Sequence, residues 1–151
     1  MDESSIMSTR RNAVTDAVSF LRSYFSAKPS YLIYFVTAVC NARCKHCFYW
    51  AEIESANARN ELKLEEIAKI ARSLDPLIYL SIGGGEPFLR SDLTQVVETY
   101  YRNSSLQYLN IVTNGVYTER VMKTVAALLI SCPRLKIKIQ VSIDDCEKAH
   151  D

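Results

Sequence analysis

The sequence predicts an α/β fold, a parallel (β/α) partial barrel with about four strands and an extra N-terminal helix. One observation is that short runs rich in aromatic and β-branched residues alternate with amphipathic segments, a pattern typical of parallel strands joined by right-handed crossovers. A second is that the cysteines, the glycines and several polar residues follow the ends of these runs, where α/β folds place their sites. We therefore expect an N-terminal extension over residues 1–30 and a core over residues 31–151.

The composition is that of an ordinary globular protein. The chain has 151 residues, of which 48% are hydrophobic and 23% charged, which suits one domain with its own core. Its net charge of +1 provides no bulk attraction to nucleic acid or to a membrane surface. The longest apolar run, residues 31–39, is too short to span a bilayer, and the acidic N-terminus does not resemble a signal peptide. Five cysteines, an odd number, argue against a disulfide framework and favour a reducing compartment, most simply the cytosol.

The first two elements follow from spacing and composition. Apolar residues recur at helical spacing between about Ser8 and Ala27, and Pro29 ends this helix near Lys28, so we expect a helix that packs as an extra layer on the domain. The run Tyr31–Thr37 is almost continuously apolar, which is typical of a parallel strand buried on both faces. A polar connection is expected over residues 48–60. The apolar residues of the N-terminal helix expected before Lys28 are Val14, Ala17, Val18, Leu21, Tyr24 and Phe25.

The rest of the chain repeats the alternation of helix and strand. Amphipathic spacing predicts helices over residues 64–74, after a cap at Ser91 and after a cap at Thr118. Strands are expected over residues 77–82, 106–113 and 136–144. In the last strand Ile137, Ile139, Val141 and Ile143 share one face, while Lys138, Gln140, Ser142 and Asp144 share the other. The polar face either lines a ligand cavity inside a barrel or is the wet face of an edge strand.

Three cysteines follow the first strand. Cys40, Cys44 and Cys47 have the spacing Cys-x3-Cys-x2-Cys, and three thiolates this close in sequence can converge on one inorganic centre. A [4Fe-4S] cluster normally takes four cysteines, so three would leave one iron open to a substrate or cofactor. The alternatives are a zinc site completed by His46, or inert thiols. Cys132 is expected to be a small buried hydrophobic residue.

A run of glycines follows the second strand. Gly83, Gly84 and Gly85 precede Glu86 and Pro87, and glycines let a backbone adopt unusual dihedral angles and let a ligand approach it closely. A plain turn between a strand and a helix is the alternative interpretation.

Taken together, these residues resemble the radical S-adenosylmethionine (SAM) superfamily. Its cluster motif, Cys-x3-Cys-x-aromatic-Cys, is matched by Cys40, Cys44, His46 and Cys47, and its Gly-Gly-Glu-Pro motif by Gly84, Gly85, Glu86 and Pro87. The segments 113–115 and 142–144 are similar to those after the third and fourth strands of many members. The resemblance covers residues 31–151 and implies a barrel that most often has six strands. The fifth and sixth are absent, so we expect this chain to be the N-terminal part of a longer protein or a truncated product.

The resemblance also implies cofactors and roles. Cys40, Cys44 and Cys47 would bind three irons of a [4Fe-4S] cluster, and SAM would chelate the fourth. His46 would lie near the adenine, residues 84–87 would receive the SAM amino group, and Ser142, Asp144 and Asn114 would meet the ribose or the methionine end.

The implied chemistry is reductive cleavage of SAM to a 5′-deoxyadenosyl radical, which abstracts hydrogen from an unknown substrate, with a peptide or a cofactor precursor as candidates. The implied partners are that substrate, a one-electron donor such as a flavodoxin or ferredoxin, and the absent C-terminal part. A non-catalytic remnant and a structural zinc module are the alternative functions.

Overall fold

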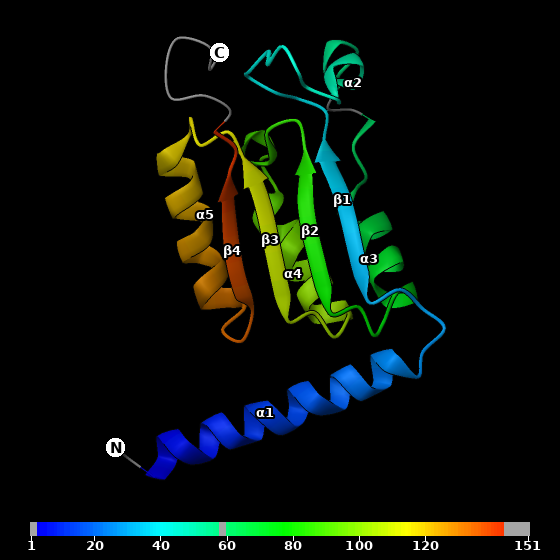
Figure 1. Ribbon diagram of the computed structural model, residues 1–151, viewed down its shortest axis with the longest axis vertical. Helices are drawn as coiled ribbons and strands as arrows, with labels where there is room; N and C mark the ends of the chain where they lie inside the picture. Colours follow the sequence, from blue (N-terminus) through cyan, green and yellow to red (C-terminus); the bar gives the residue numbers. More distant parts are fainter. Residues whose placement is uncertain (1–2, 58–59, 144–151) are drawn as a thin grey trace.

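The computed structural model describes residues 3–57 and 60–143 and contains one four-stranded sheet (Figure 1). The strands are β1 (Tyr31–Thr37), β2 (Tyr79–Gly84), β3 (Tyr108–Thr113) and β4 (Lys136–Val141), and they lie side by side in chain order. All three strand pairs are parallel. The predicted α/β class and partial barrel are confirmed, because each of the first three strands is followed by a helix that returns the chain to the amino end of the sheet.

Three helices cover one face of this sheet. They are α3 (Leu64–Ser73), α4 (Leu93–Asn103) and α5 (Thr118–Ser131), and their apolar sides pack on alternate strand residues to form one core. The predicted apolar face of α4 is confirmed, since Leu93, Val96, Val97 and Tyr100 are all buried. On α5 only Leu128 is fully buried, whereas the apolar residues Met122 and Leu129 are exposed.

The other face of the sheet is open in the described part of the chain. The prediction that β1 is buried on both faces is therefore wrong, because Tyr31, Ile33 and Phe35 are 50%, 60% and 43% exposed on the open side. Their neighbours Leu32, Tyr34 and Val36 belong to the core cluster on the helix side. The nearly continuous apolar sequence gave no sign that only one face is covered.

Strand β4 alternates as predicted up to Gln140. It ends at Val141 instead of residue 144, and the prediction that Val141 and Ile143 share the apolar face is wrong, because they are 49% and 68% exposed. Ile137 and Ile139 pack against the core, whereas Lys138 and Gln140 are exposed on the open face. On the same face the side-chain amide of Asn110 donates to Ser81 Oγ at 3.2 Å and to Gln140 Oε1 at 3.5 Å. The open face is thus polar near its centre, and β4 forms an edge of the described sheet. A ligand cavity on this face stays a prediction, and Asp144 lies outside the described residues.

Local predictions at three element boundaries need correction. The connection expected over residues 48–60 contains a short helix, α2 (Trp50–Glu54), which buries Ile53. Ser91 does not cap α4, because a 3-10 helix, η2 (Pro87–Leu89), comes first and Asp92 is the N-cap residue. Thr118 lies inside α5 rather than at its cap, and its hydroxyl donates to the carbonyl of Gly115.

The first helix, α1 (Glu3–Tyr24), begins earlier than expected and crosses beneath the amino ends of the strands (Figure 1). The prediction that its apolar side packs on the domain is wrong, because Val14, Val18 and Leu21 are all exposed. Polar contacts join it to the core instead, with Arg22 Nη2 3.2 Å from Asp75 Oδ2 and Lys136 Nζ 3.7 Å from Asp16 Oδ2. Within the described residues, no helix has the length and apolar character needed to cross a membrane.

Replacing Leu21 by serine is expected to change the free energy of unfolding by less than about 0.5 kcal/mol, because exposed positions contribute little. The matched control is Ile67→Val in the core, which is expected to lower that free energy by about 1 kcal/mol, since Ile67 is completely buried. Urea denaturation followed by circular dichroism measures both. A larger loss for Leu21→Ser than for Ile67→Val would mean that α1 packs on the domain.

Candidate functional site

The three clustered cysteines lie above the carboxyl ends of the strands. The segment after β1 extends across the top of the sheet toward β3, as the cyan loop in Figure 1 shows. Cys40, Cys44 and Cys47 are partly exposed cysteines that line one cavity of about 300 Å³, together with Trp50 and Ile53 of α2. A hydrogen bond of 3.1 Å from Cys47 N to Cys44 O closes the turn between the second and third cysteines. The structure therefore brings the predicted thiols to one shared space.

This donor set fits a [4Fe-4S] cluster. Within the described residues, no three histidine, cysteine or acidic side chains are placed to hold a single metal ion, so this arrangement does not decide between the cluster and the zinc alternative with His46. In a cubane each cysteine binds its own iron, so its thiolates lie around a cluster and do not meet at one point. Cys132 is 1% exposed in the core, and burial raises the pKa of its thiol, which makes it a poor ligand.

The glycines at the end of β2, Gly84 in the strand and Gly85 directly after it, allow the cysteine loop to lie close against them. Gly85 N donates to Thr37 O and Glu86 N donates to Val39 O, both at 2.8 Å. A Cβ on Gly84 would lie 2.4 Å from Thr37 O, and a Cβ on Gly85 would lie 2.3 Å from Val39 O. Gly84 also has φ +112°, which side chains disfavour. An ammonium group only donates hydrogen bonds, so this segment could bind one only through its carbonyl oxygens.

Glu86 is buried, with 1% of its surface exposed, and its carboxylate is fully engaged. Oε1 accepts from Phe88 N at 3.2 Å and from Thr113 Oγ1 at 2.8 Å, while Oε2 accepts from Asn114 N at 2.9 Å. Three donors compensate the buried charge. The side chain therefore joins the ends of β2 and β3, and Pro87 behind it is buried as the first residue of η2.

The other predicted site residues that the structure describes also lie at the carboxyl edge of the sheet. Asn114 follows β3 and its side-chain amide donates to Asn41 Oδ1 in the cysteine loop at 2.9 Å. Ser142 follows β4, and its N–H donates to Thr113 O at 2.9 Å. His46 is an exposed residue of the cysteine loop. Asp144 lies outside the described residues, so its place in the site stays a prediction.

Sequence reasoning missed a buried arginine beside the site. The guanidinium of Arg90 donates to Val36 O at 2.8 Å, to Leu62 O at 2.7 Å and to Asp92 Oδ1 at 2.7 Å. Burial opposes its charge, but the hydrogen bond to Asp92 and the negative charges nearby raise its pKa, so Arg90 stays cationic. The only sequence signal is an acidic residue two positions later, which is too common to predict a buried ion pair.

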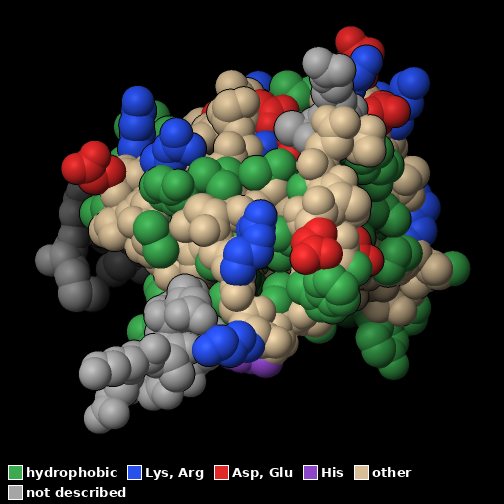
Figure 2. Space-filling model, turned by 90° about the horizontal axis from the view of Figure 1, so that it is seen from above, with side chains coloured by type: hydrophobic (Ala, Val, Ile, Leu, Met, Phe, Trp, Pro, Cys, Tyr) green, Lys and Arg blue, Asp and Glu red, His purple; other side chains and the backbone are tan. Residues whose placement is uncertain are grey.

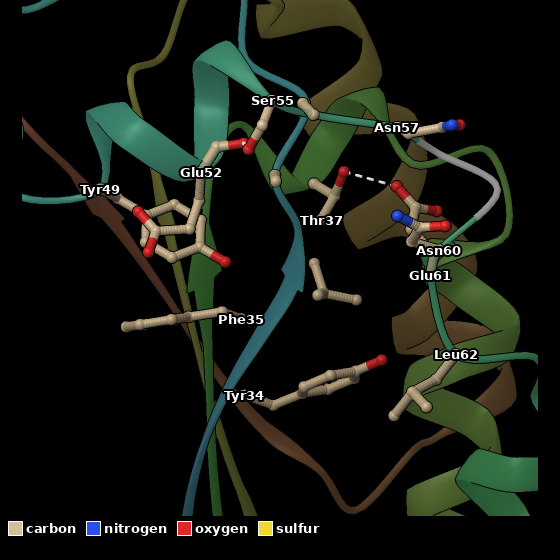
Figure 3. A pocket seen from close by; sticks show the side chains of 13 residues that line it. Tyr34, Phe35, Thr37, Tyr49, Glu52, Ser55, Asn57, Asn60, Glu61 and Leu62 are labelled. Atoms are coloured by element: carbon tan, nitrogen blue, oxygen red, sulfur yellow. Dashed lines mark hydrogen bonds between the residues drawn. The ribbon is translucent and has the colours of Figure 1, made fainter.

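A pocket of about 390 Å³ lies between the end of β1, the segment before α3 and Tyr49 (Figure 3). The hydroxyl of Thr37 points across it to Glu61, and Thr37 Oγ1 donates to Glu61 Oε1 at 2.5 Å. Glu61 Oε2 also lies 3.7 Å from Arg90 Nε, so the pocket wall is tied to the buried cation. These contacts hold the segment before α3 against the end of β1.

Among the described residues, the face above the sheet carries no large patch of one charge. Figure 2 shows lysine, arginine and acidic side chains scattered among hydrophobic ones on this side. This mixture agrees with the net charge of +1. Electrostatic capture of a polyanion by this face is therefore not indicated.

Comparison with known proteins gives a match to the family model of the radical SAM superfamily over residues 34–150. Molybdenum cofactor biosynthesis protein 1 of Homo sapiens is 30% identical over 106 residues, 69% of this chain and 17% of the human protein. GTP 3′,8-cyclase of Haemophilus ducreyi is 34% identical over 98 residues, 64% of this chain and 29% of that protein. The enzyme of the same name from Actinobacillus pleuropneumoniae is 30% identical over 112 residues, 73% of this chain and 33% of that protein. The chain thus spans at most about a third of these relatives.

Proposed function

Since the chain belongs to the radical SAM superfamily, whose members are enzymes that use a [4Fe-4S] cluster and SAM, we propose that it forms the cluster and SAM site of such an enzyme. The observation that carries this proposal is that Cys40, Cys44 and Cys47 line one cavity beside the segment 84–87. In this proposal residues 31–151 are the catalytic core and residues 1–30 an extension.

Each group at the carboxyl edge has a proposed role. The three cysteines bind three irons, and when bound the cluster supplies the electron that cleaves SAM reductively. Carbonyl oxygens of residues 84–87 accept from the SAM ammonium group, because an ammonium group only donates hydrogen bonds. His46 lies near the adenine, and Ser142 with Asp144 meets the ribose or the methionine end. Asn114 was a further candidate for this contact.

The substrate is proposed from the names of the relatives. Two of them are called GTP 3′,8-cyclase and one a molybdenum cofactor biosynthesis protein, which favours a cofactor precursor, with GTP as the first compound to test, over a peptide. The proposed electron donor is a flavodoxin or ferredoxin. A cytoplasmic location is proposed because the odd number of cysteines suits a reducing compartment.

The test is anaerobic reconstitution with iron and sulfide, followed by electron paramagnetic resonance of the reduced protein with and without SAM. We expect a cubane signal that changes when SAM is added. Cys47→Ser is expected to lose most of the signal, and Cys132→Ser to keep it, because Cys132 is buried away from the loop. A signal indifferent to SAM would contradict the SAM site, and bound zinc without a cluster would favour the structural alternative.

A further inference from the structure

The cysteine loop is joined to the turn after β3 by one pair of asparagines. Asn41 directly follows Cys40, and its Oδ1 accepts from Asn114 Nδ2 at 2.9 Å. The two residues are 73 positions apart in the chain, so this contact is tertiary. At the base of the loop, Glu86 N holds Val39 O. Cys40 therefore sits between two attachments, one on each side in sequence.

The direction of the asparagine bond is fixed by its surroundings. Asn114 Oδ1 already accepts from Val116 N at 3.1 Å, which leaves Nδ2 to face Asn41. Asn41 then presents its oxygen, so the pair consists of one donor and one acceptor. The bond is lost when both positions offer only acceptors or when either side chain is removed.

The position of Asn114 is in turn set by the buried carboxylate. Glu86 Oε2 accepts from Asn114 N, and Glu86 Oε1 accepts from the hydroxyl of the preceding Thr113. The contacts therefore run from the end of β2, through Glu86 to the end of β3, and through Asn114 to the cysteine loop. Each link is a hydrogen bond of 2.8 or 2.9 Å.

We propose that Asn41 and Asn114 are positioning residues that clasp the cysteine loop to β3 and fix Cys40 for cluster binding. Asn114 then acts on the cluster through Asn41 and needs no contact with SAM. The consequence for the cluster rests on the proposed function, but the clasp itself is a property of the chain without metal. The hydrogen-bonded clasp and its effect on cluster binding can therefore be tested, and refuted, separately.

The first test measures thiol reactivity in the metal-free, reduced protein. Trypsin cleaves after Arg43 and Lys45, so alkylation of Cys40 by N-ethylmaleimide can be followed on its own peptide. Asn41→Ala and Asn114→Ala are expected to speed this alkylation about fivefold, the factor that corresponds to one net neutral hydrogen bond. Cys132, which is buried in the core, reports unfolding of the whole domain and is expected to react at an unchanged rate.

Aspartate variants supply the matched control. Asn41→Asp keeps an acceptor opposite Asn114 Nδ2 and is expected to react like wild type. Asn114→Asp is also expected to react like wild type, because the exposed Asn41 amide can turn and donate its Nδ2 to the new carboxylate. The double variant Asn41→Asp/Asn114→Asp has two acceptors and no donor, so it is expected to react at least as fast as the alanine variants. A double variant as slow as Asn41→Asp would overturn the clasp, as would unchanged Cys40 rates in all variants or acceleration of Cys132 in parallel with Cys40.

The second test uses the reconstituted protein. A chelator is expected to remove iron about fivefold faster from the double variant Asn41→Asp/Asn114→Asp than from Asn41→Asp, by the loss of this one bond. Equal rates would overturn the role of the clasp in cluster binding even if the thiol result holds. Failure of the wild type to assemble any cluster would instead refute the proposed function, and the alkylation result would still decide the clasp.

Discussion

Gly85→Ala is expected to lower the free energy of unfolding by about 3 kcal/mol and to prevent cluster assembly, because its new Cβ would overlap a backbone atom. The Cβ would lie 2.3 Å from Val39 O and 2.7 Å from Val39 C, and neither can move without shifting the cysteine loop. The hydrogen bonds from Gly85 N and Glu86 N to the end of β1 would be lost with that shift. Urea denaturation gives the stability, and iron content after reconstitution gives the effect on the loop.

The matched control is the glycine two positions earlier. A Cβ on Gly83 would meet only ring atoms of Phe35 at 3.7 Å, an ordinary contact. Gly83→Ala is therefore expected to change the free energy of unfolding by less than about 1 kcal/mol, with a gain possible from the stiffer unfolded chain. Equal losses for Gly83→Ala and Gly85→Ala would show that close approach of the loop is not what requires glycine here.

Glu86→Ala is expected to lower the free energy of unfolding by about 4 kcal/mol, since it leaves buried donors without an acceptor. The N–H groups of Phe88 and Asn114 and the hydroxyl of Thr113 would all lose their partner. Urea denaturation of Glu86→Ala and of the wild type measures this loss of free energy.

Two further variants separate charge from shape at this position. Glu86→Gln keeps the volume but must turn its amide toward a donor, so we expect a loss of about 2 kcal/mol. Glu65→Ala, on the exposed side of α3, is the control and is expected to change the free energy of unfolding by less than about 0.5 kcal/mol. If Glu86→Ala were as mild as Glu65→Ala, the carboxylate would not hold the ends of β2 and β3 together.

The sequence was most informative where one local pattern decides the structure. The run Tyr31–Thr37 matches β1 residue for residue, because bulky aromatic and β-branched side chains leave no competing conformation. Its burial was predicted wrongly, since hydrophobicity does not say whether a second layer covers the sheet. The cap predictions at Ser91 and Thr118 failed for another reason, as η2 and the turn before α5 satisfy those helix starts in other ways.

At the candidate site too, features set by local sequence could be predicted and features set by distant partners could not. Spacing alone predicted that Cys40, Cys44 and Cys47 share one place, and the structure puts all three on one cavity. The roles of Arg90 and Asn41 could not be predicted, because each depends on partners far away in sequence. Arg90 meets Val36 and Leu62, 54 and 28 positions earlier, and no local pattern encodes such a meeting.

The pairing of β1 with β2 determines the order in which this region can assemble. Tyr31 lies opposite Tyr79, so the first strand leaves the ribosome long before its partner and the cysteine loop emerges between them. Val39, at the base of that loop, gains its hydrogen bond only when Glu86 has been added to the chain. Contacts so distant in sequence form slowly. The thiols are therefore synthesised early and positioned late, and cluster insertion is expected to follow completion of the sheet.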